Sequence, residues 1–199
     1  MLTLNNLCFD YQDRPLLQNI QFSLKKGELM HLKGANGSGK TTLLKIISGL
    51  HRPHSGDVCF NEESIYLNLA TYQHMLCYIG HRSGINPTLT LKQNLYFDLH
   101  YQNQDLRQLA AVFSLHRLLD TPAAYLSAGQ RRQVGLLKLW LEEKSLWLLD
   151  EPLVALDEAT LNILAAKIEQ HRQRGGMILL TSHQKLPDLL GDYQEYYLS

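Results

Sequence analysis

A glycine-rich stretch carries the most specific chemistry in this sequence. It runs Gly34-Ala35-Asn36-Gly37-Ser38-Gly39-Lys40-Thr41, which matches G-x-x-x-x-G-K-[ST] at every fixed position. Glycines let backbone N–H groups turn inward around a β-phosphate, Lys40 can bridge β- and γ-phosphate oxygens, and the Thr41 hydroxyl can bind Mg²⁺. Thr42 adds a hydroxyl near the α-phosphate. A plain connecting loop is the alternative, but a strand pattern before it and a helix pattern after it favour binding of ATP or GTP.

Two adjacent carboxylates follow an apolar run further along the chain. Asp150 and Glu151 come directly after the apolar residues 146–149, at the predicted end of a buried strand. Adjacent side chains of a strand point in opposite directions, so one carboxylate can face a magnesium ion and the other the γ-phosphate with its attacking water. We therefore assign Asp150 to Mg²⁺, through water, and Glu151 to general base catalysis. A solvated pair opening the turn at Pro152 is the alternative, which the phosphate loop disfavours.

A third segment precedes a long helical pattern and reads Leu126-Ser127-Ala128-Gly129-Gln130. A serine hydroxyl and free N–H groups at a helix N-terminus can hold a γ-phosphate, although such residues are also ordinary helix caps. The first two motifs alone also fit kinases, helicases and GTPases. This segment resembles the LSGGQ signature of the ABC ATPase family, with Ala128 in place of the first glycine, and its position before the carboxylates favours that family.

The elements around these motifs predict the fold. Strands are expected at 28–33, 145–149 and 177–181, helices at 41–50 and 158–174, and a small antiparallel layer from the apolar alternation at 2–9 and the run at 22–24. Short strands are expected at 57–60 and 76–79, and amphipathic helices at 91–101, 105–116 and 130–142. We predict an α/β fold: a P-loop NTPase (RecA-like) core with an antiparallel β subdomain and an inserted helical subdomain, of the ABC ATPase type.

The chain has the length of one domain, and its 199 residues are 45% hydrophobic. We expect a single ATP-binding domain, with the core and β subdomain at about 1–83 and 144–199 and the helical subdomain at about 84–143. Nineteen basic residues balance nineteen acidic ones, which argues against nucleic acid as a partner. Cys8, Cys59 and Cys77 show no metal-ligand spacing and are expected to be buried, reduced thiols.

No apolar stretch approaches the roughly 18 residues of a membrane span, and the N-terminus lacks the pattern of a signal peptide. We therefore expect the chain to stay in the cytosol and to reach a membrane only through a partner.

The resemblance to ABC ATPases covers essentially the whole chain. It implies that Tyr11 stacks on adenine, that Ala155-Leu156-Asp157 is the D-loop, and that His183 of Thr181-Ser182-His183 is the catalytic switch histidine. Taken singly, these residues also fit a core tyrosine, a helix cap and a surface histidine. The resemblance further implies a head-to-tail homodimer, in which the signature of one protomer closes over ATP and Mg²⁺ held by the phosphate loop of the other.

One position departs from the family pattern. Where the family usually has a nucleotide-sensing glutamine, this chain has His81, within Ile79-Gly80-His81-Arg82. A neutral imidazole can still bind the water around Mg²⁺, whereas protonation would place a cation beside the metal. We expect His81 to line the nucleotide site and the loop to differ in its response to pH.

The sequence is also similar to the ATP-binding subunits of the haem exporter of bacterial cytochrome c maturation. The similarity lies in Ile79-Gly80-His81, in the signature followed by Arg131-Arg132, in Leu139-Trp140-Leu141 and Leu146-Trp147, and in Thr181-Ser182-His183-Gln184. It implies an ATPase on the cytoplasmic face of the inner membrane that couples dimer closure to haem export or release through integral membrane subunits. No direct haem binding is expected, because the histidines are scattered and no C-x-x-C-H occurs.

Three alternatives remain at this point. The chain could drive transport of another substrate. A soluble ABC ATPase of DNA repair or of the ribosome is disfavoured, because such proteins carry long coiled coils or two fused cassettes. A small-molecule kinase would leave residues 126–130 and His183 unexplained.

Overall fold

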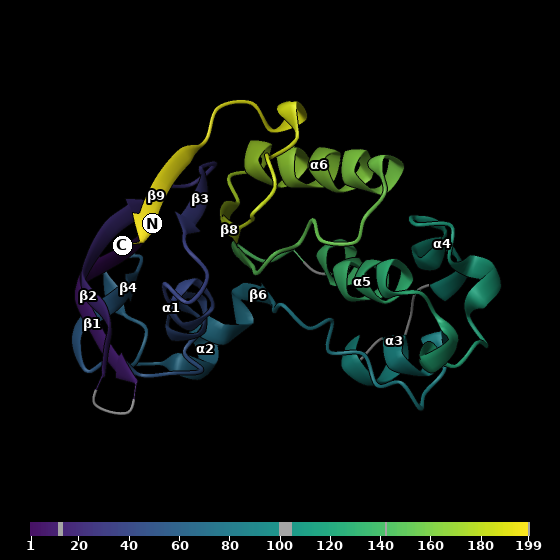
Figure 1. Cartoon of the computed structure of the whole chain (residues 1–199), viewed down its shortest axis with the longest axis horizontal. Helices are drawn as coiled ribbons and strands as arrows, with labels where there is room; N and C mark the ends of the chain where they lie inside the picture. The colour runs from purple at the N-terminus through teal and green to yellow at the C-terminus, as the bar shows by residue number, and fades with distance from the viewer. Residues whose placement is uncertain (12–13, 100–104, 142, 199) are drawn as a thin grey trace.

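The computed structural model describes residues 1–11, 14–99, 105–141 and 143–198. Within these residues the strands form two sheets, and the antiparallel sheet lies at the opposite end of the molecule from the helices α3, α4 and α5 (Figure 1). The α/β architecture predicted from the sequence is therefore confirmed.

The central sheet is parallel and supports the predicted chemistry. Its described strands have the order β6-β7-β8-β3-β9, with β3 at Leu29–Gly34, β6 at Leu76–Ile79, β7 at Leu146–Leu149, β8 at Met177–Thr181 and β9 at Gln194–Leu198. Alternate side chains enter two different apolar cores: Leu146 and Leu148 pack on one side, and Trp147 and Leu149 on the other. Both faces are thus covered, which explains why β7 and β8 are continuous apolar runs.

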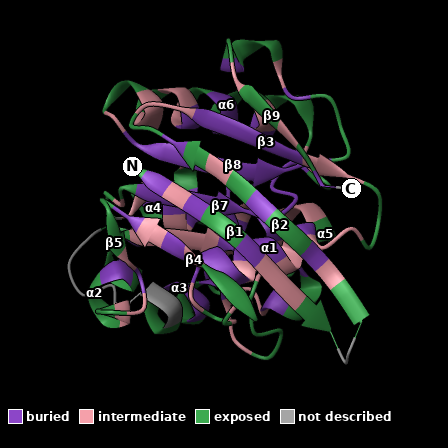
Figure 2. Cartoon of the chain, turned by 90° about the vertical axis from the view of Figure 1, so that its left-hand side faces the viewer, coloured by how far each residue is buried: buried purple, intermediate pink, exposed green. Residues whose placement is uncertain are grey.

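The antiparallel sheet covers one face of this core together with helix α1. Its described strands have the order β2-β1-β4-β5, with β1 at Leu2–Tyr11, β2 at Arg14–Leu24, β4 at Ser55–Phe60 and β5 at Glu63–Ser64. Along β1 the buried positions step from Leu4 to Leu7, because the pairing is irregular there and Asn6 adopts a positive φ of 45°. Figure 2 shows exposed and buried residues alternating along these outer strands.

Helices complete the two layers. Helix α1 (Lys40–Ile47) lies beneath the antiparallel sheet with α2 (Leu69–His74), while α6 (Glu158–Gln173) covers the opposite face of the parallel sheet. Between β6 and β7 the described residues form α3 (Leu91–Leu99), α4 (Leu106–Ala111) and α5 (Ala128–Leu136), with 3₁₀ turns η1 (His116–Leu118), η2 (Ala123–Tyr125) and η3 (Leu137–Trp140). We call residues 84–143 the helical region.

Several predicted boundaries were wrong. The helix expected at 105–116 ends at Ala111, because Ser114 takes a positive φ of 58°. The one expected at 130–142 begins earlier, at Ala128, and tightens into a 3₁₀ turn at Leu137. The predicted helix ends at 100–101 and 142 lie outside the described residues, and Cys8, Cys59 and Cys77 are half-buried rather than buried. Among the helices described, none is long and apolar enough to cross a membrane.

Candidate functional site

The phosphate loop lies where β3 ends and α1 begins, as its motif requires. Gly37 and Gly39 have φ values of 84° and 95°, a left-handed backbone that glycine adopts without strain. Gly39 caps α1 without a side-chain hydrogen bond in the described structure, so the first N–H groups of the helix face the loop without a side-chain acceptor. An anion is the natural acceptor for such a helix end.

Lys40 points back into this loop. Its Nζ donates to the carbonyl oxygens of Gly34 and Ala35 at 2.8 and 2.9 Å, and the side chain is only 8% exposed. Ser38 Oγ is buried without a hydrogen-bond partner among the described residues. A Cβ on Gly34 would lie 2.5 Å from that Oγ and 2.8 Å from the Leu198 carbonyl oxygen. The loop thus combines a buried cation with an unused hydroxyl, which is the donor set that a polyphosphate needs.

Asp150 lies at the carboxyl edge of the sheet between two threonine hydroxyls. Thr41 Oγ1 donates to its Oδ2 at 2.8 Å and Thr181 Oγ1 donates to its Oδ1 at 2.9 Å. The Asp150 side chain is 2% exposed, so both hydroxyls share its charge in a largely dehydrated setting. The adjacent Thr41 hydroxyl and carboxylate form an oxygen donor set of the kind that Mg²⁺ prefers, so the residues present fit a magnesium ion.

Glu151 turns away from Asp150 and meets His183. Its Oε2 accepts a hydrogen bond from the His183 backbone N–H at 3.2 Å, and the His183 Nε2 lies 3.5 Å from its Oε1. Glu151 Oε1 is buried without a hydrogen-bond partner in the described part of the chain. The two carboxylates therefore face different groups, as the strand geometry predicted, and one Glu151 oxygen can accept a proton.

A cavity of about 510 Å³ brings these groups together. Its described lining consists of most of the phosphate loop and the start of α1, both carboxylates, the predicted sensing and switch histidines, and a leucine from β2, namely Leu16, Asn36, Gly37, Gly39, Lys40, Thr41, Thr42, His81, Asp150, Glu151 and His183. Most of these residues follow the carboxyl ends of β3, β6, β7 and β8, which meet at one edge of a parallel sheet.

Of the predicted site residues, Gly34, Ala35 and Ser38 of the phosphate loop do not line this cavity as the described residues define it, and neither do Tyr11 and the signature. Tyr11 ends β1 with 60% of its surface exposed. Ser127, Ala128, Gly129 and Gln130 begin α5 in the helical region. Ser127 Oγ accepts from the Gln130 N–H at 3.1 Å, and Gln130 Oε1 accepts from the Ser127 N–H at 2.9 Å. This capping box fixes the start of the helix and leaves Ser127 and Ala128 on the surface.

The two small residues of the signature have unequal surroundings. Ala128 is exposed, whereas a Cβ on Gly129 would lie 2.6 Å from the carbonyl oxygen of Ala155, in the predicted D-loop. This contact explains why alanine is compatible with the first position and glycine is needed at the second.

Replacing Gly129 by alanine is expected to destabilise the chain by about 1–3 kcal/mol, because the new methyl group meets backbone that cannot move aside freely. The matched variant Ala128→Gly is expected to cost no more than about 1 kcal/mol. Thermal unfolding of both variants measures the difference. Equal losses of stability would contradict the close approach to Ala155.

Sequence reasoning missed three contributors: Leu16, Thr181 and Arg132. Arg132 is 6% exposed and donates to the carbonyl oxygens of both Asp150 and Glu151 at 2.8 Å. Burial lowers the pKa of Arg132, while the nearby Asp150 and Glu151 charges raise it. Nothing in its sequence neighbourhood distinguishes it from the more accessible Arg131.

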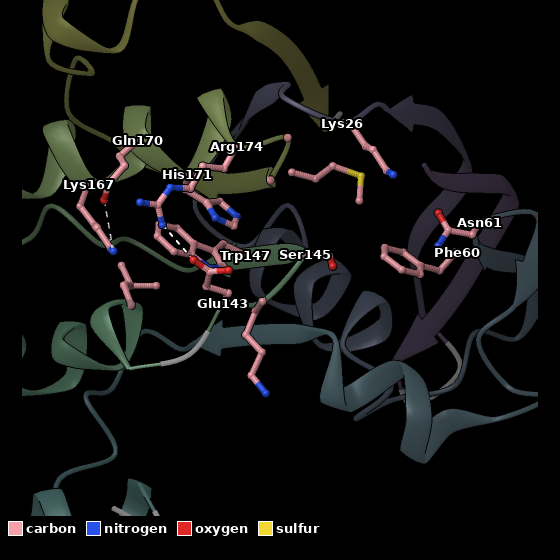
Figure 3. A pocket seen from close by; sticks show the side chains of 15 residues that line it. Lys26, Phe60, Asn61, Glu143, Ser145, Trp147, Lys167, Gln170, His171 and Arg174 are labelled. Atoms are coloured by element: carbon pink, nitrogen blue, oxygen red, sulfur yellow. Dashed lines mark hydrogen bonds and ion pairs between the residues drawn. The ribbon is translucent and has the colours of Figure 1, made fainter. Parts of the chain in front are cut away.

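A second cavity, of about 350 Å³, lies at the other edge of the parallel sheet, near the start of β7 and β8 (Figure 3). Two of its lining residues, His171 and Trp147, stack on each other, with ring centroids 3.8 Å apart and ring planes 2° from parallel. Burial lowers the pKa of His171 to about 4, so the ring is neutral at physiological pH. This cavity contains none of the predicted site residues.

This fold, with a phosphate loop and paired carboxylates at the carboxyl edge of its parallel sheet and a signature-like helix start, defines an ATP-binding cassette. A sequence model of the family described as "ABC transporter" matches residues 17–154, and the chain belongs to that family of ATP-binding ATPases.

Within the family, the chain is similar to export proteins of cytochrome c biogenesis. It is 54% identical over 200 residues, covering 100% of both chains, to the "Cytochrome c biogenesis ATP-binding export protein CcmA" of Legionella pneumophila (strain Paris). It is 41% identical over 191 residues to the protein of the same name from Haemophilus influenzae, with 94% of this chain and 90% of that protein covered. The chain therefore belongs to the same family as these ATP-binding export proteins.

Solved structures agree on the fold. "Structure of ATP binding subunit of ABC transporter" describes a chain that is 28% identical, with a TM-score of 0.81 and 92% of this chain and 79% of that chain covered. "Dimeric Structure of MJ0796, a Bacterial ABC Transporter Cassette" has a TM-score of 0.84 at 22% identity, with 100% of this chain and 94% of that chain covered.

Proposed function

We propose that this ABC-type ATPase hydrolyses ATP between two copies of the chain and thereby drives haem export, or release of haem, in the biogenesis of c-type cytochromes. The observation that best supports this proposal is that one cavity is lined by residues of the phosphate loop together with Asp150, Glu151 and His183. The names of the relatives from Legionella pneumophila and Haemophilus influenzae support the pathway.

The contacts within the cavity support the following binding roles. Backbone N–H groups of the phosphate loop and of the start of α1 receive the phosphates, and Lys40 moves its contacts from the loop carbonyl oxygens toward phosphate oxygens. Thr41 and Asp150 would hold Mg²⁺, which supplies charge neutralisation at the β- and γ-phosphates. His81 lines the same cavity, where a ring nitrogen can bind water at the metal, and Tyr11 offers an exposed ring to adenine.

The catalytic roles fall to Glu151 and His183. Glu151 Oε1 carries no hydrogen bond among the described residues and can take the proton of the attacking water. His183 holds the other oxygen through its backbone N–H, while its side chain is 53% exposed. The exposed ring can therefore turn toward a γ-phosphate without unpacking a core.

We propose that a complete site needs two protomers. In the described structure Ser127, Ala128, Gly129 and Gln130 lie outside the cavity that holds the phosphate loop. A partner's helix start can supply N–H groups and the Ser127 hydroxyl to the γ-phosphate from the open side. The MJ0796 cassette, described as dimeric, has this fold.

The helical region, which we propose as a subdomain at about 84–143, is the expected contact with integral membrane subunits. Phe97 and Tyr125 are 79% and 81% exposed, and Tyr96 is 49% exposed. Tyr96 and Phe97, together with Leu89 and Gln93, line a shallow apolar pocket of about 390 Å³. Exposed aromatic side chains of this kind anchor protein interfaces. Docking there would hold the ATPase at the cytoplasmic face of the inner membrane.

The pathway is tested by deleting the gene and measuring covalent haem in c-type cytochromes. We expect that haem to disappear, to return with the unaltered gene, and to stay absent with a Glu151→Gln variant expressed at the same level. Intact c-type cytochromes in the deletion strain would refute the haem assignment and favour another transported substrate.

The docking face is tested by co-purification with the membrane fraction. We expect Phe97→Asp to lower the membrane-bound share of the chain. Leu67→Asp is the matched control, because Leu67 is also 79% exposed but lies between β5 and α2, outside the helical region. Equal behaviour of the two variants would contradict docking through the helical region.

A further inference from the structure

Arg132 connects α5, the helix that begins with the signature, to the ends of strands β6 and β7 of the parallel sheet. Its Nη2 donates to the carbonyl oxygens of Asp150 and Glu151, both at 2.8 Å, and its Nη1 donates to the carbonyl oxygen of Gly80 at 2.8 Å. Gly80 follows β6, Asp150 and Glu151 follow β7, and Arg132 lies on α5, whose first turn is capped by Ser127. One guanidinium group thus spans the helical region and the core.

Such a buried cation requires compensation. Arg132 is 6% exposed, and dehydration of a charge is unfavourable unless hydrogen bonds replace the lost water. Its contacts are to backbone carbonyl groups, so the side chains of Asp150 and Glu151 remain available for other work. An apolar residue would fill the same space without fixing those carbonyl groups. The hydrogen bonds from Arg132 therefore orient the backbone of Asp150 and Glu151, in addition to filling space.

The backbone that Arg132 fixes is an unusual one. Glu151 has a positive φ of 51°, a left-handed conformation that is unfavourable for residues other than glycine. Its N–H donates to Thr181 Oγ1 at 2.9 Å, and its carbonyl oxygen accepts from Arg132. The residue is therefore held on both sides, and its left-handed backbone sets the direction in which its carboxylate leaves the strand.

We infer that Arg132 is a positioning residue, which holds Glu151 in the left-handed conformation that aims its carboxylate into the cavity and ties that conformation to the signature helix α5. The inference rests on the proposed role of Glu151 as general base. In a dimer, the helix that contacts the partner's nucleotide would then also set the base of its own site. A change at one site can reach the other through this single side chain.

The first test compares Arg132→Gln with Arg131→Gln. Arg131 is the matched control, because it lies on the same helix but donates to carbonyl oxygens of Ala123 and Leu126 inside the helical region. We expect Arg132→Gln to lower kcat by about 100-fold, the effect of misplacing a catalytic group by a small distance, with little change in the Kd for ATP. Arg131→Gln should keep the kcat of the unaltered chain. Loss of ATP binding equal to the loss of kcat would overturn the positioning role.

The decisive test is a double-mutant cycle with Glu151→Gln, measured as single-turnover hydrolysis. If Arg132 acts through Glu151, then Arg132→Gln causes no further loss once the carboxylate is gone. Losses that multiply would overturn the inference and leave the base assignment intact. Full turnover in Glu151→Gln alone would instead refute the base assignment. If Arg132→Gln fails to fold, Arg132→Lys enters the same cycle, because an ammonium keeps the charge without the planar fork.

Discussion

Replacing Glu151 by glutamine is expected to lower ATP hydrolysis by about 10²–10⁴-fold, the usual contribution of a general base, while ATP stays bound. An amide oxygen can still accept the His183 N–H bond, but the amide cannot take a proton from water. Because the γ-phosphate persists, we expect the variant to accumulate as a dimer in the presence of Mg²⁺ and ATP.

Size-exclusion chromatography with labelled ATP and single-turnover hydrolysis measure these two outcomes. Glu143→Gln is the matched control, since it makes the same chemical change at a side chain that is 90% exposed and lies away from the cavity. The control should turn over ATP normally and remain a monomer after hydrolysis. A monomeric Glu151→Gln variant holding ATP would contradict the two-protomer site.

Removing the Lys40 amine is expected to lower the affinity for ATP strongly. A hydrogen bond to a charged group contributes about 1.5–3 kcal/mol, so Lys40→Ala should raise the Kd for ATP by roughly 10–100-fold. The loss includes a second part, because the carbonyl oxygens of Gly34 and Ala35 also lose their donor. The empty loop should then relax and present its N–H groups less accurately.

Titration calorimetry with ATP measures this effect. Lys45→Ala is the control, because Lys45 lies in the last turn of the same helix, α1, and does not line the cavity. If Lys40→Ala bound ATP as tightly as Lys45→Ala, the phosphate loop would not be the nucleotide site.

The sequence predicted the parts of the site whose residues are close neighbours in the chain. The phosphate loop needs neighbouring residues at fixed spacing, and the Asp150 and Glu151 pair needs only an apolar run before it. Both were placed at the carboxyl edge of the sheet, where the structure has them. His81 and His183 came from resemblance rather than from chemistry, yet both line the cavity.

The parts that the sequence did not predict depend on contacts between distant segments. Arg132 and Thr181 meet the carboxylates from α5 and β8, and neither contact can be predicted from the residues next to it in the sequence. Strand β9 (Gln194–Leu198) was also missed. Only its last residue is buried, and its sequence shows no apolar alternation. The short helix α2 buries only Tyr72 and gave no helical pattern.

The position of β3 in the parallel sheet bears on how the chain is made. The strand that leads into the phosphate loop is flanked by β8 and β9, and Lys33 contacts Tyr197 across 164 positions of sequence. During synthesis β3 emerges early and has neither neighbour until nearly all of the described chain has followed. Contacts of such long range form late in folding. A nascent chain that still lacks β8 and β9 therefore leaves β3 unpaired on both sides, and we expect it not to bind ATP tightly.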